Sequence, residues 1–406
     1  MKIRDHGGSH AADPKRRGKK VLLIVGIVLA VIAAAVAIYA IWERPPAIPD
    51  TPGPSAPPPT STVRPSAKPG DPTPSLPPDD DPVEDYTNAL VTDRAPGTYT
   101  ALLVGRDYAS NSTDTIIVVR MDTKAHTIDF VSLPRDTLIN ISWSGSPKKL
   151  NSVYPGYINS GKNGIDGLKE HVKNLLGFDV DCYVVVSIQA VERAVDTIGG
   201  VWFDVPTDMH YWDPTQNLTI NIDAGYQLLN GEDAVKVCRF RDTYAGGDIE
   251  RIGVQQDFLR ALASQILTLG NIPNLPTLID ILVENVETDL TAANIAWFAR
   301  QFLACGMDGI SFQTMPWSNG CLINGVSFVS VGLNDWLAMI NERLNPYVEP
   351  VTAANVNILM SDYSGINISS TTGVISGGPD SFFCLPCTVA NEGKSVHHLP
   401  GTCPQG

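Results

Sequence analysis

Two aspartates stand at the ends of predicted strands, where their carboxylates can reach a common ligand. Asp107 follows an apolar run that begins at Tyr99, and Asp114 precedes the next apolar run. Carboxylate oxygens are ligands that Mg²⁺ prefers, so the pair can share one such cation across the short loop between them. Aspartate also stabilises turns, and from the spacing alone turn capping is the better explanation.

Arginine supplies the second set of reactive groups, because its fork-shaped guanidinium matches phosphate oxygens. Arg135 and Asp136 come shortly after a predicted strand, and Arg239 and Arg241 flank Phe240. In an extended segment Arg239 and Arg241 would share one face while Phe240 turns toward the core. Two adjacent arginines repel each other unless an anion lies between them, which predicts a bound pyrophosphate. The alternatives are an Arg135–Asp136 surface pair and solvent exposure of the other two arginines.

A predicted helix that starts near Asp248 begins with a polar stripe. On a helix of about 100° per residue, Asp248, Arg251 and Gln255 fall within about 60° of each other. They lie at the helix end whose dipole favours anions. Farther along, the same stripe becomes Phe258 and Leu262, and this apolar trough behind a polar head suits an amphiphile with an anionic headgroup. The alternative is that the helix simply becomes more buried.

Two further side chains, Lys149 and Asn151, belong to a Lys-Lys-Leu-Asn segment and are able to bind phosphate. Individually they are unspecific. No Ser-His-Asp or Cys-His arrangement for nucleophilic catalysis is visible, and no glycine-rich phosphate loop. The net charge of −14 argues against sequence-independent binding of nucleic acid, which depends on Lys and Arg.

The elements that must position these side chains alternate between strands and helices. Such alternation predicts one α/β domain in which helices cover a mostly internal sheet. Apolar runs predict strands at residues 99–104, 115–120, 126–133 and 182–188. Helical periodicity is found at residues 164–176, 189–198, 229–237, 249–269, 275–286, 292–305 and 335–344.

Composition divides the rest of the chain into segments of different kinds. Residues 1–20 form a basic tail, and residues 21–42 carry no charge and are long enough, at about 1.5 Å per residue, to span a bilayer. This run is longer than the apolar region of a cleaved secretory signal, which is the alternative. The positive-inside rule then leaves the N-terminus cytoplasmic and everything that follows outside the cell. We expect a single-pass protein of the cell membrane.

The outside portion is expected to consist of three parts. Residues 43–97 are a proline-rich disordered stalk, residues 98–349 are the folded domain, and residues 350–406 are a loosely ordered tail. All seven cysteines lie outside, where disulfides persist. The tail sequence Cys384-x-x-Cys387, followed by two histidines and Cys403, is also compatible with a zinc cluster, but its irregular spacing favours disulfides.

Taken together, these blocks resemble the LytR–CpsA–Psr family of membrane-anchored cell-wall enzymes. The resemblance runs from about Tyr99 to Leu262 in family order. Its blocks are LLVGRD, TDT with an apolar strand, VSLPRDT, KKLN, DTIGGVWFDVP, LLNGEDAVKVCRFR and DIERIGVQQ. Two departures are a short loop between Asp107 and Asp114, and Val254 where the family usually has arginine.

The resemblance implies an α–β–α sandwich with a central mixed sheet. It also implies transfer of a glycopolymer from a polyprenyl pyrophosphate carrier to a muramyl hydroxyl of peptidoglycan, as a phosphodiester. Asp107 and Asp114 would hold Mg²⁺, or Mn²⁺ in its place. Pyrophosphate would be bound by the residues named above: Arg135, Arg239, Arg241, Arg251 and Gln255, with Lys149 and Asp248 nearby.

Asp136 and Asp248 are both candidates for the base that accepts the hydroxyl proton. Phosphoryl transfer depends on positioning and charge neutralisation, which fits a metal and several arginines. Two other functions remain open. With water as acceptor the same site would be a pyrophosphatase, and without turnover the protein would be a lipid-binding or regulatory envelope protein.

Overall fold

The computed structural model describes residues 45–46, 94–106, 113–141, 148–214, 218–240, 248–268, 274–323, 325–361 and 368–376. Within these residues no helix is both long and apolar enough to cross a bilayer. The basic tail, the apolar segment 21–42 and nearly all of the stalk lie outside them, so the membrane span stays a prediction.

The centre of the domain is a six-stranded mixed sheet, as the family resemblance implies. Its strand order is β11-β6-β1-β2-β3-β12. Strands β1, β2 and β3 form an antiparallel meander, while β6 joins β1 and β12 joins β3 in parallel. The strands are β1 (Thr98–Arg106), β2 (Thr113–Asp122), β3 (Thr127–Ser132), β6 (Cys182–Ser187), β11 (Val286–Thr288) and β12 (Ile310–Thr314).

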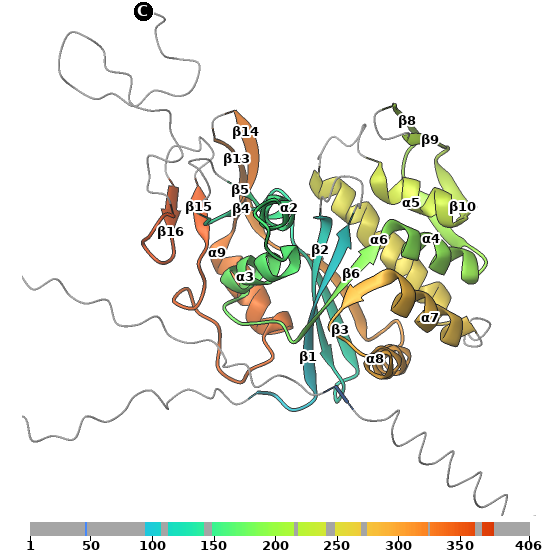
Figure 1. Cartoon of the computed structure of the whole chain (residues 1–406), viewed down its shortest axis with the longest axis horizontal. Coiled ribbons are helices and arrows are strands. Elements are labelled where there is room, and N and C mark those ends of the chain that lie inside the picture. Colours follow the sequence, from blue (N-terminus) through green and yellow to red (C-terminus); the bar gives the residue numbers. More distant parts are fainter. Residues whose placement is uncertain are drawn as a thin grey trace, which may run out of the picture.

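Helices cover both faces of this sheet, which makes three layers (Figure 1). On one face lie α2 (Val153–Asn159), α3 (Gly164–Leu176), α9 (Leu333–Met339) and a π-helical turn over Ile340–Leu344. On the other lie α4 (Ile188–Thr197), α6 (Asp248–Ile266), α7 (Leu275–Asn285) and α8 (Ala292–Cys305). Alternate residues of β1, Leu102 and Val104, are buried against the first layer together with Leu168 and Trp336. The period-2 pattern of the strand thus selects the face that forms the main core.

The four strands of a side lobe, which form two antiparallel pairs, were not predicted, although the helix of this lobe was. Its elements are β7 (Val201–Val205), β8 (Met209–Asp213), β9 (Leu218–Ile222), β10 (Gly225–Leu229) and α5 (Gly231–Arg239). With α4 and α6 they enclose a second core that contains Phe203, Ile220, Val237 and Phe258. Helix α6 therefore lies between the central sheet and this lobe.

Another hairpin and two short two-stranded ribbons complete the described fold. They are β13 (Trp317–Ile323) with β14 (Val326–Val331), β4 (Leu138–Ile139) with β5 (Lys148–Lys149), and β15 (Leu359–Ser361) with β16 (Ile368–Ser370). A 3-10 turn, Leu150–Ser152, follows β5. Val351, Val356 and Ile358 are buried in the main core. The folded domain therefore continues past the boundary predicted at residue 349.

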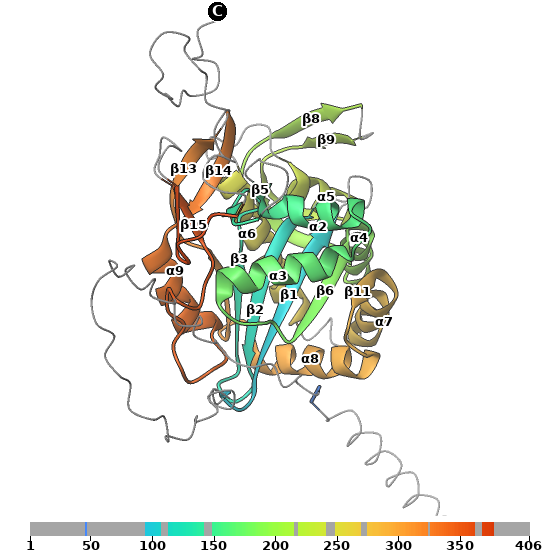
Figure 2. The same ribbon diagram turned by 60° about the vertical axis from the view of Figure 1, so that its left-hand side comes forward.

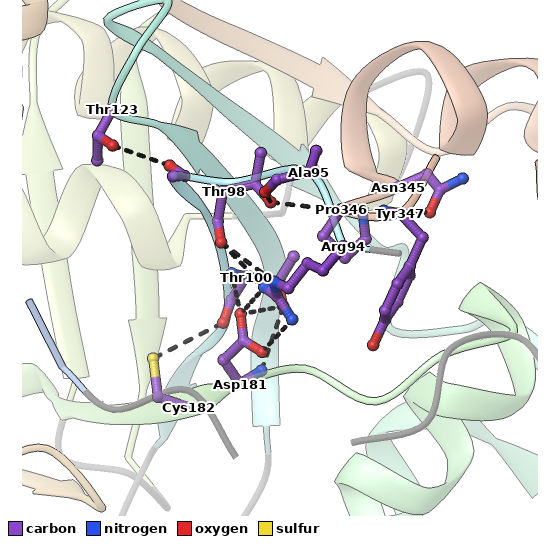
Figure 3. Close-up of polar contacts among 11 residues, drawn as sticks. Arg94, Ala95, Thr98, Thr100, Thr123, Asp181, Cys182, Asn345, Pro346 and Tyr347 are labelled. Atoms are coloured by element: carbon purple, nitrogen blue, oxygen red, sulfur yellow. Dashed lines mark hydrogen bonds and ion pairs between the residues drawn. The ribbon is translucent and has the colours of Figure 1, made fainter. Parts of the chain in front are cut away.

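A partly buried ion pair holds the start of β1 in place (Figure 3). The guanidinium of Arg94 binds both carboxylate oxygens of Asp181, with Nη1 2.7 Å from Oδ1. Asp181 Oδ2 also accepts hydrogen bonds from the backbone N–H (2.7 Å) and the hydroxyl (3.0 Å) of Thr100. Arg94 lies over the ring of Tyr347, which belongs to the C-terminal part of the domain. These contacts fasten the beginning of β1 to two distant segments.

Three of the cysteines that the structure describes are thiols rather than disulfides. Cys182, Cys238 and Cys305 are free, and burial raises the pKa of both Cys182 and Cys238 to about 12. The disulfides predicted for the tail concern Cys384, Cys387 and Cys403, which lie outside the described residues.

Candidate active site

The first part of the site is an ion pair between neighbouring strand ends. Pairing of β2 with β3 places Ile117 opposite Ser132, so the start of β2 lies beside the segment that follows β3. Arg135 Nη1 donates to Asp114 Oδ1 at 2.7 Å, and both side chains are partly exposed. The two motifs predicted to bind metal and phosphate therefore meet through a charged hydrogen bond.

Asp136 joins Arg135 to the Lys-Lys-Leu-Asn segment. Its Oδ1 lies 3.7 Å from Arg135 Nε, and its Oδ2 lies 3.1 Å from Lys149 Nζ. Pairing of β4 with β5 sets Lys149 opposite Leu138. The backbone N–H of Asn151 donates to the carbonyl of Arg135 at 3.0 Å. One carboxylate thus holds two cations at fixed positions.

The first turns of α6 reach the same strand end. Arg251 is only 2% exposed, and its Nη2 donates to the backbone carbonyl of Asp114 at 3.3 Å. Gln255 accepts from the hydroxyl of Thr115 (3.4 Å) and donates to the carbonyl of Cys238 (3.0 Å). Gln255 therefore connects the start of β2 with the end of α5.

Arg239 is the last residue of α5, next to Cys238. The helix begins at Asn230, whose side chain accepts from Asp233 N, and it has acidic residues in its first turn and basic ones in its last. That charge distribution opposes the helix dipole and stabilises the helix. Arg239 is therefore helical, which corrects the extended conformation predicted for it, because the helix runs two residues farther than its apolar pattern. Phe240 is fully buried as predicted, and Arg241 lies outside the described residues.

The predicted apolar trough has a different environment from the one expected. Phe258 is fully buried and packs edge-to-face against Phe203 at 5.8 Å between ring centroids. Leu262 is partly buried against the same cluster. At Phe258, protein rather than lipid covers the ring, because α6 is buried on its sheet side and on its lobe side. At this position the alternative interpretation is correct: the helix becomes more buried along its length.

The groups that could hold a metal are described only in part. Asp107 and the side chain of Asp248 lie outside the description, and the described residues contain no cluster of three or more His, Cys, Asp or Glu able to hold an ion. Asp114 remains partly exposed beside Arg135, and a carboxylate can accept further bonds through its other lone pairs. Its chemistry fits Mg²⁺, and a second oxygen donor would have to come from Asp107.

Two side chains at this end of the sheet were missed by sequence analysis. Arg106, the last residue of β1, donates to the hydroxyl of Tyr154 at 3.0 Å and lies over its ring. Gln256 Nε2 lies within 3.0 Å of acceptors on Ser132, Gln313 and Thr314 and so holds α6 against β3 and β12. Arg106 stands beside Asp107 in the sequence, and this adjacency was the available signal. The contacts of Gln256 are long-range and leave no local pattern.

The assembled site concentrates cations in a chain of net charge −14. Arg135, Lys149 and Arg251 come from three separate segments and are connected through Asp114 and Asp136. Arg239 ends α5 next to Cys238, whose carbonyl accepts a hydrogen bond from Gln255. Such a set can bind a multiply charged anion and neutralise charge that develops on its oxygens. All of it lies where β1 and β6 end and β2 begins.

Known proteins with similar sequences share this part of the chain. Residues 78–344 match the LytR_cpsA_psr family. A Bacillus subtilis protein, polyisoprenyl-teichoic acid–peptidoglycan teichoic acid transferase TagV, is 31% identical over 49% of this chain and 52% of its own length. The cell wall biosynthesis protein LcpA of Corynebacterium glutamicum is 29% identical over 60% of this chain and 51% of its own. The chain thus spans about half the length of these two relatives.

Solved structures agree on the fold. The crystal structure of B. subtilis TagV aligns with a TM-score of 0.51 at 24% identity and covers 61% of this chain and 96% of that one. The Streptococcus agalactiae protein gbs0355 aligns with a TM-score of 0.53 at 20% identity, over 63% and 91% of the two chains. These likenesses concern the mixed sheet and its helices. Because the family match covers well over half of the sequence and contains every block of the site, the chain belongs to the LytR–CpsA–Psr family.

Proposed function

We propose that the protein transfers a glycopolymer from a polyprenyl pyrophosphate carrier to a muramyl hydroxyl of peptidoglycan, as a phosphodiester. The observation that carries this proposal is the set of three cations, Arg135, Lys149 and Arg251, connected through Asp114 and Asp136. The names of the related TagV and TagU proteins, teichoic acid transferases to peptidoglycan, support the choice of donor and acceptor.

The chemistry follows from the charges. The acceptor hydroxyl attacks the phosphorus that carries the glycan; a new P–O bond forms while the P–O bond to the polyprenyl phosphate breaks. Polyprenyl monophosphate leaves, and the hydroxyl proton passes to a carboxylate. Arg135 and Arg239 would bind the pyrophosphate oxygens, where negative charge grows as the bond breaks.

The remaining residues would set the geometry. Arg251 and Gln255 fix the start of β2 against α6 and α5, and Asp136 holds Arg135 and Lys149 in place. Because both oxygens of Asp136 face cations, we assign it a positioning role and favour Asp248 as the proton acceptor. Mg²⁺ bound by Asp107 and Asp114 would neutralise further charge on the pyrophosphate.

The test is a transfer assay with the full-length protein, a polyprenyl-pyrophosphate-linked glycopolymer and peptidoglycan. Arg135→Ala and Arg239→Ala should each lower the rate by roughly 10²–10³-fold, the usual effect of removing one charge-stabilising group. Arg260→Ala is the matched control, since Arg260 lies on the exposed side of α6 and pairs with Asp257.

The outcomes separate the three functions. Product that forms only with peptidoglycan supports the transferase. Glycopolymer phosphate released at the same rate without acceptor would identify a pyrophosphatase. Tight binding of the donor without any turnover would identify a binding or regulatory protein.

A further inference from the structure

Two hairpins lie at the same end of the domain as the candidate active site. Hairpin β13–β14 lies directly beside it: Val329 N donates to the carbonyl of Asp136 at 2.9 Å, and Lys149 Nζ lies over the ring of Phe328. Hairpin β8–β9 packs on α5, the helix that ends in Arg239. Figures 1 and 2 show both hairpins at the top of the molecule, opposite the end at which β1 begins.

The outer side of each hairpin carries one large apolar side chain that is well exposed among the described residues. Trp212 on β8 is 72% exposed, and Leu322, near the β13–β14 turn, is 57% exposed. The register pairs Trp212 with Thr219 and Leu322 with Ser327, whereas Cys321 and its partner Phe328 lie on the buried side of β13–β14.

Charged residues are missing from the same segments. The sequence from Gly309 to Asn334 contains no Asp, Glu, Lys or Arg, and Met209–Ile222 contains a single one, Asp213. Proteins normally place charges on exposed strands to prevent association in water. In a chain of net charge −14, these hairpins lie beside the cationic candidate site and, apart from Asp213, add no negative charge that anionic headgroups of a membrane would repel.

We propose that the outer sides of hairpins β8–β9 and β13–β14 dock onto the lipid bilayer, with Trp212 and Leu322 buried at the boundary of headgroups and acyl chains. Tryptophan is enriched at that depth, and leucine gains free energy there by leaving water. The inference rests on the proposed function, because a donor held in the membrane by its polyprenyl chain requires the site end of the domain to face the bilayer.

The position of the chain's attachment allows this orientation. Arg94 and Asp181 fix the chain at the beginning of β1, and the site lies at its other end, about 30 Å away for nine residues at about 3.3 Å each. Within the stalk predicted for residues 43–97, residues 43–82 alone reach roughly 120 Å if extended at about 3.1 Å per residue. Such a tether is long enough for the domain to turn its site end toward the membrane that anchors it.

The experiment places a photo-crosslinking amino acid in the full-length protein. Reconstituted with vesicles of phosphatidylethanolamine and phosphatidylglycerol, Trp212→p-benzoylphenylalanine and Leu322→p-benzoylphenylalanine should form adducts with lipid several-fold more often than Trp202→p-benzoylphenylalanine. Trp202 is the matched control, because it is 49% exposed on the strand pair β7–β10, where it stacks on Tyr226. Thermal melting of each variant verifies that the fold is intact.

Equal lipid crosslinking at positions 202, 212 and 322, or its absence at 212 and 322, would overturn the docking surface. Adducts with added peptidoglycan fragments in place of lipid would overturn it in favour of a glycan-binding surface. Crosslinking needs no turnover, so the transfer assay on the same samples is independent. Lipid adducts without transfer would reject the proposed function and leave the membrane contact standing.

Discussion

At the scale of single residues, the sequence indicated which side chains belong together but not how they are held. Arg135, Lys149, Arg251 and Gln255 were each predicted to bind the substrate, and they are connected in the structure. The ion pair of Asp114 with Arg135 was not predicted, because a contact between residues 21 positions apart depends on the register of β2 and β3. Sequence patterns report local spacing and leave such pairings undetermined.

One prediction at this scale concerns the metal. If Asp114 supplies an oxygen ligand, Asp114→Asn should raise the Mg²⁺ concentration needed for half-maximal transfer, because an amide carries no negative charge. Chelator should abolish transfer by the unmodified protein, and Mg²⁺ or Mn²⁺ should restore it. Rates measured across a metal titration provide the comparison. Full activity in excess chelator would contradict a metal requirement.

A second residue-scale prediction concerns His171 on α3. Burial lowers the pKa of its imidazole below the ordinary 6.5, although nearby Glu170 opposes this. The unfolded chain therefore binds a proton more readily than the folded one below about pH 6.5. The stability that His171 contributes is complete above that pH and falls as the pH drops toward the folded-state pKa. Urea unfolding of the protein and of His171→Gln between pH 5 and 7 should show a weaker pH dependence in the variant; parallel curves would contradict this.

At the scale of elements, long helices were predicted well and short hairpins poorly. Helices α3 and α8 coincide with the predicted ranges, since each combines a clear cap with one apolar face. Strands β7 and β10 were missed because Trp202 and Tyr226 are large apolar residues that lie exposed. The sequence of these strands therefore does not alternate between apolar and polar residues. The polar stripe of α6 was located correctly, but its apolar stripe was misplaced because two faces of that helix are buried.

The element-scale prediction tests what fastens the start of β1. Asp181→Ala removes the carboxylate that neutralises the partly buried guanidinium of Arg94, which then keeps only the carbonyl of Thr98, and it removes the acceptor of the Thr100 N–H. Breaking a buried pair in this way typically costs about 3–5 kcal/mol. Asp179→Ala is the control, because its pair with Lys173 is largely exposed and should cost less than about 1 kcal/mol. Urea unfolding free energies of the two variants give the answer, and equal losses would mean that the buried pair contributes no special stability.

At the scale of the whole molecule, the folded domain ends later in the chain than the composition predicts. Glycine, serine and asparagine after residue 349 suggested a loose tail, yet four apolar residues among them, Val351, Val356, Ile358 and Leu359, are buried. Composition averages over a window, whereas Val351, Val356 and Ile358 fill the main core one at a time. The three-layer architecture was anticipated, and the extent of the domain was not. The segment after residue 349 is also joined to the active-site side of the fold, because Ile358 bridges to Ile139 on β4.

The last prediction follows from that boundary. A chain that ends at residue 349 loses Val351, Val356, Ile358 and Leu359, all nearly or fully buried. Each buried aliphatic side chain contributes roughly 1.5–3 kcal/mol, and their combined loss approaches the whole stability of an ordinary domain, about 5–15 kcal/mol. We expect this chain to be unfolded at 37 °C, by circular dichroism and thermal melting, and to be inactive. A chain that ends at Ser376 keeps every described core contact and should melt as the full-length protein does. If both truncations melt alike, residues 350–376 do not belong to the cooperative core, and the domain ends where composition first placed its boundary.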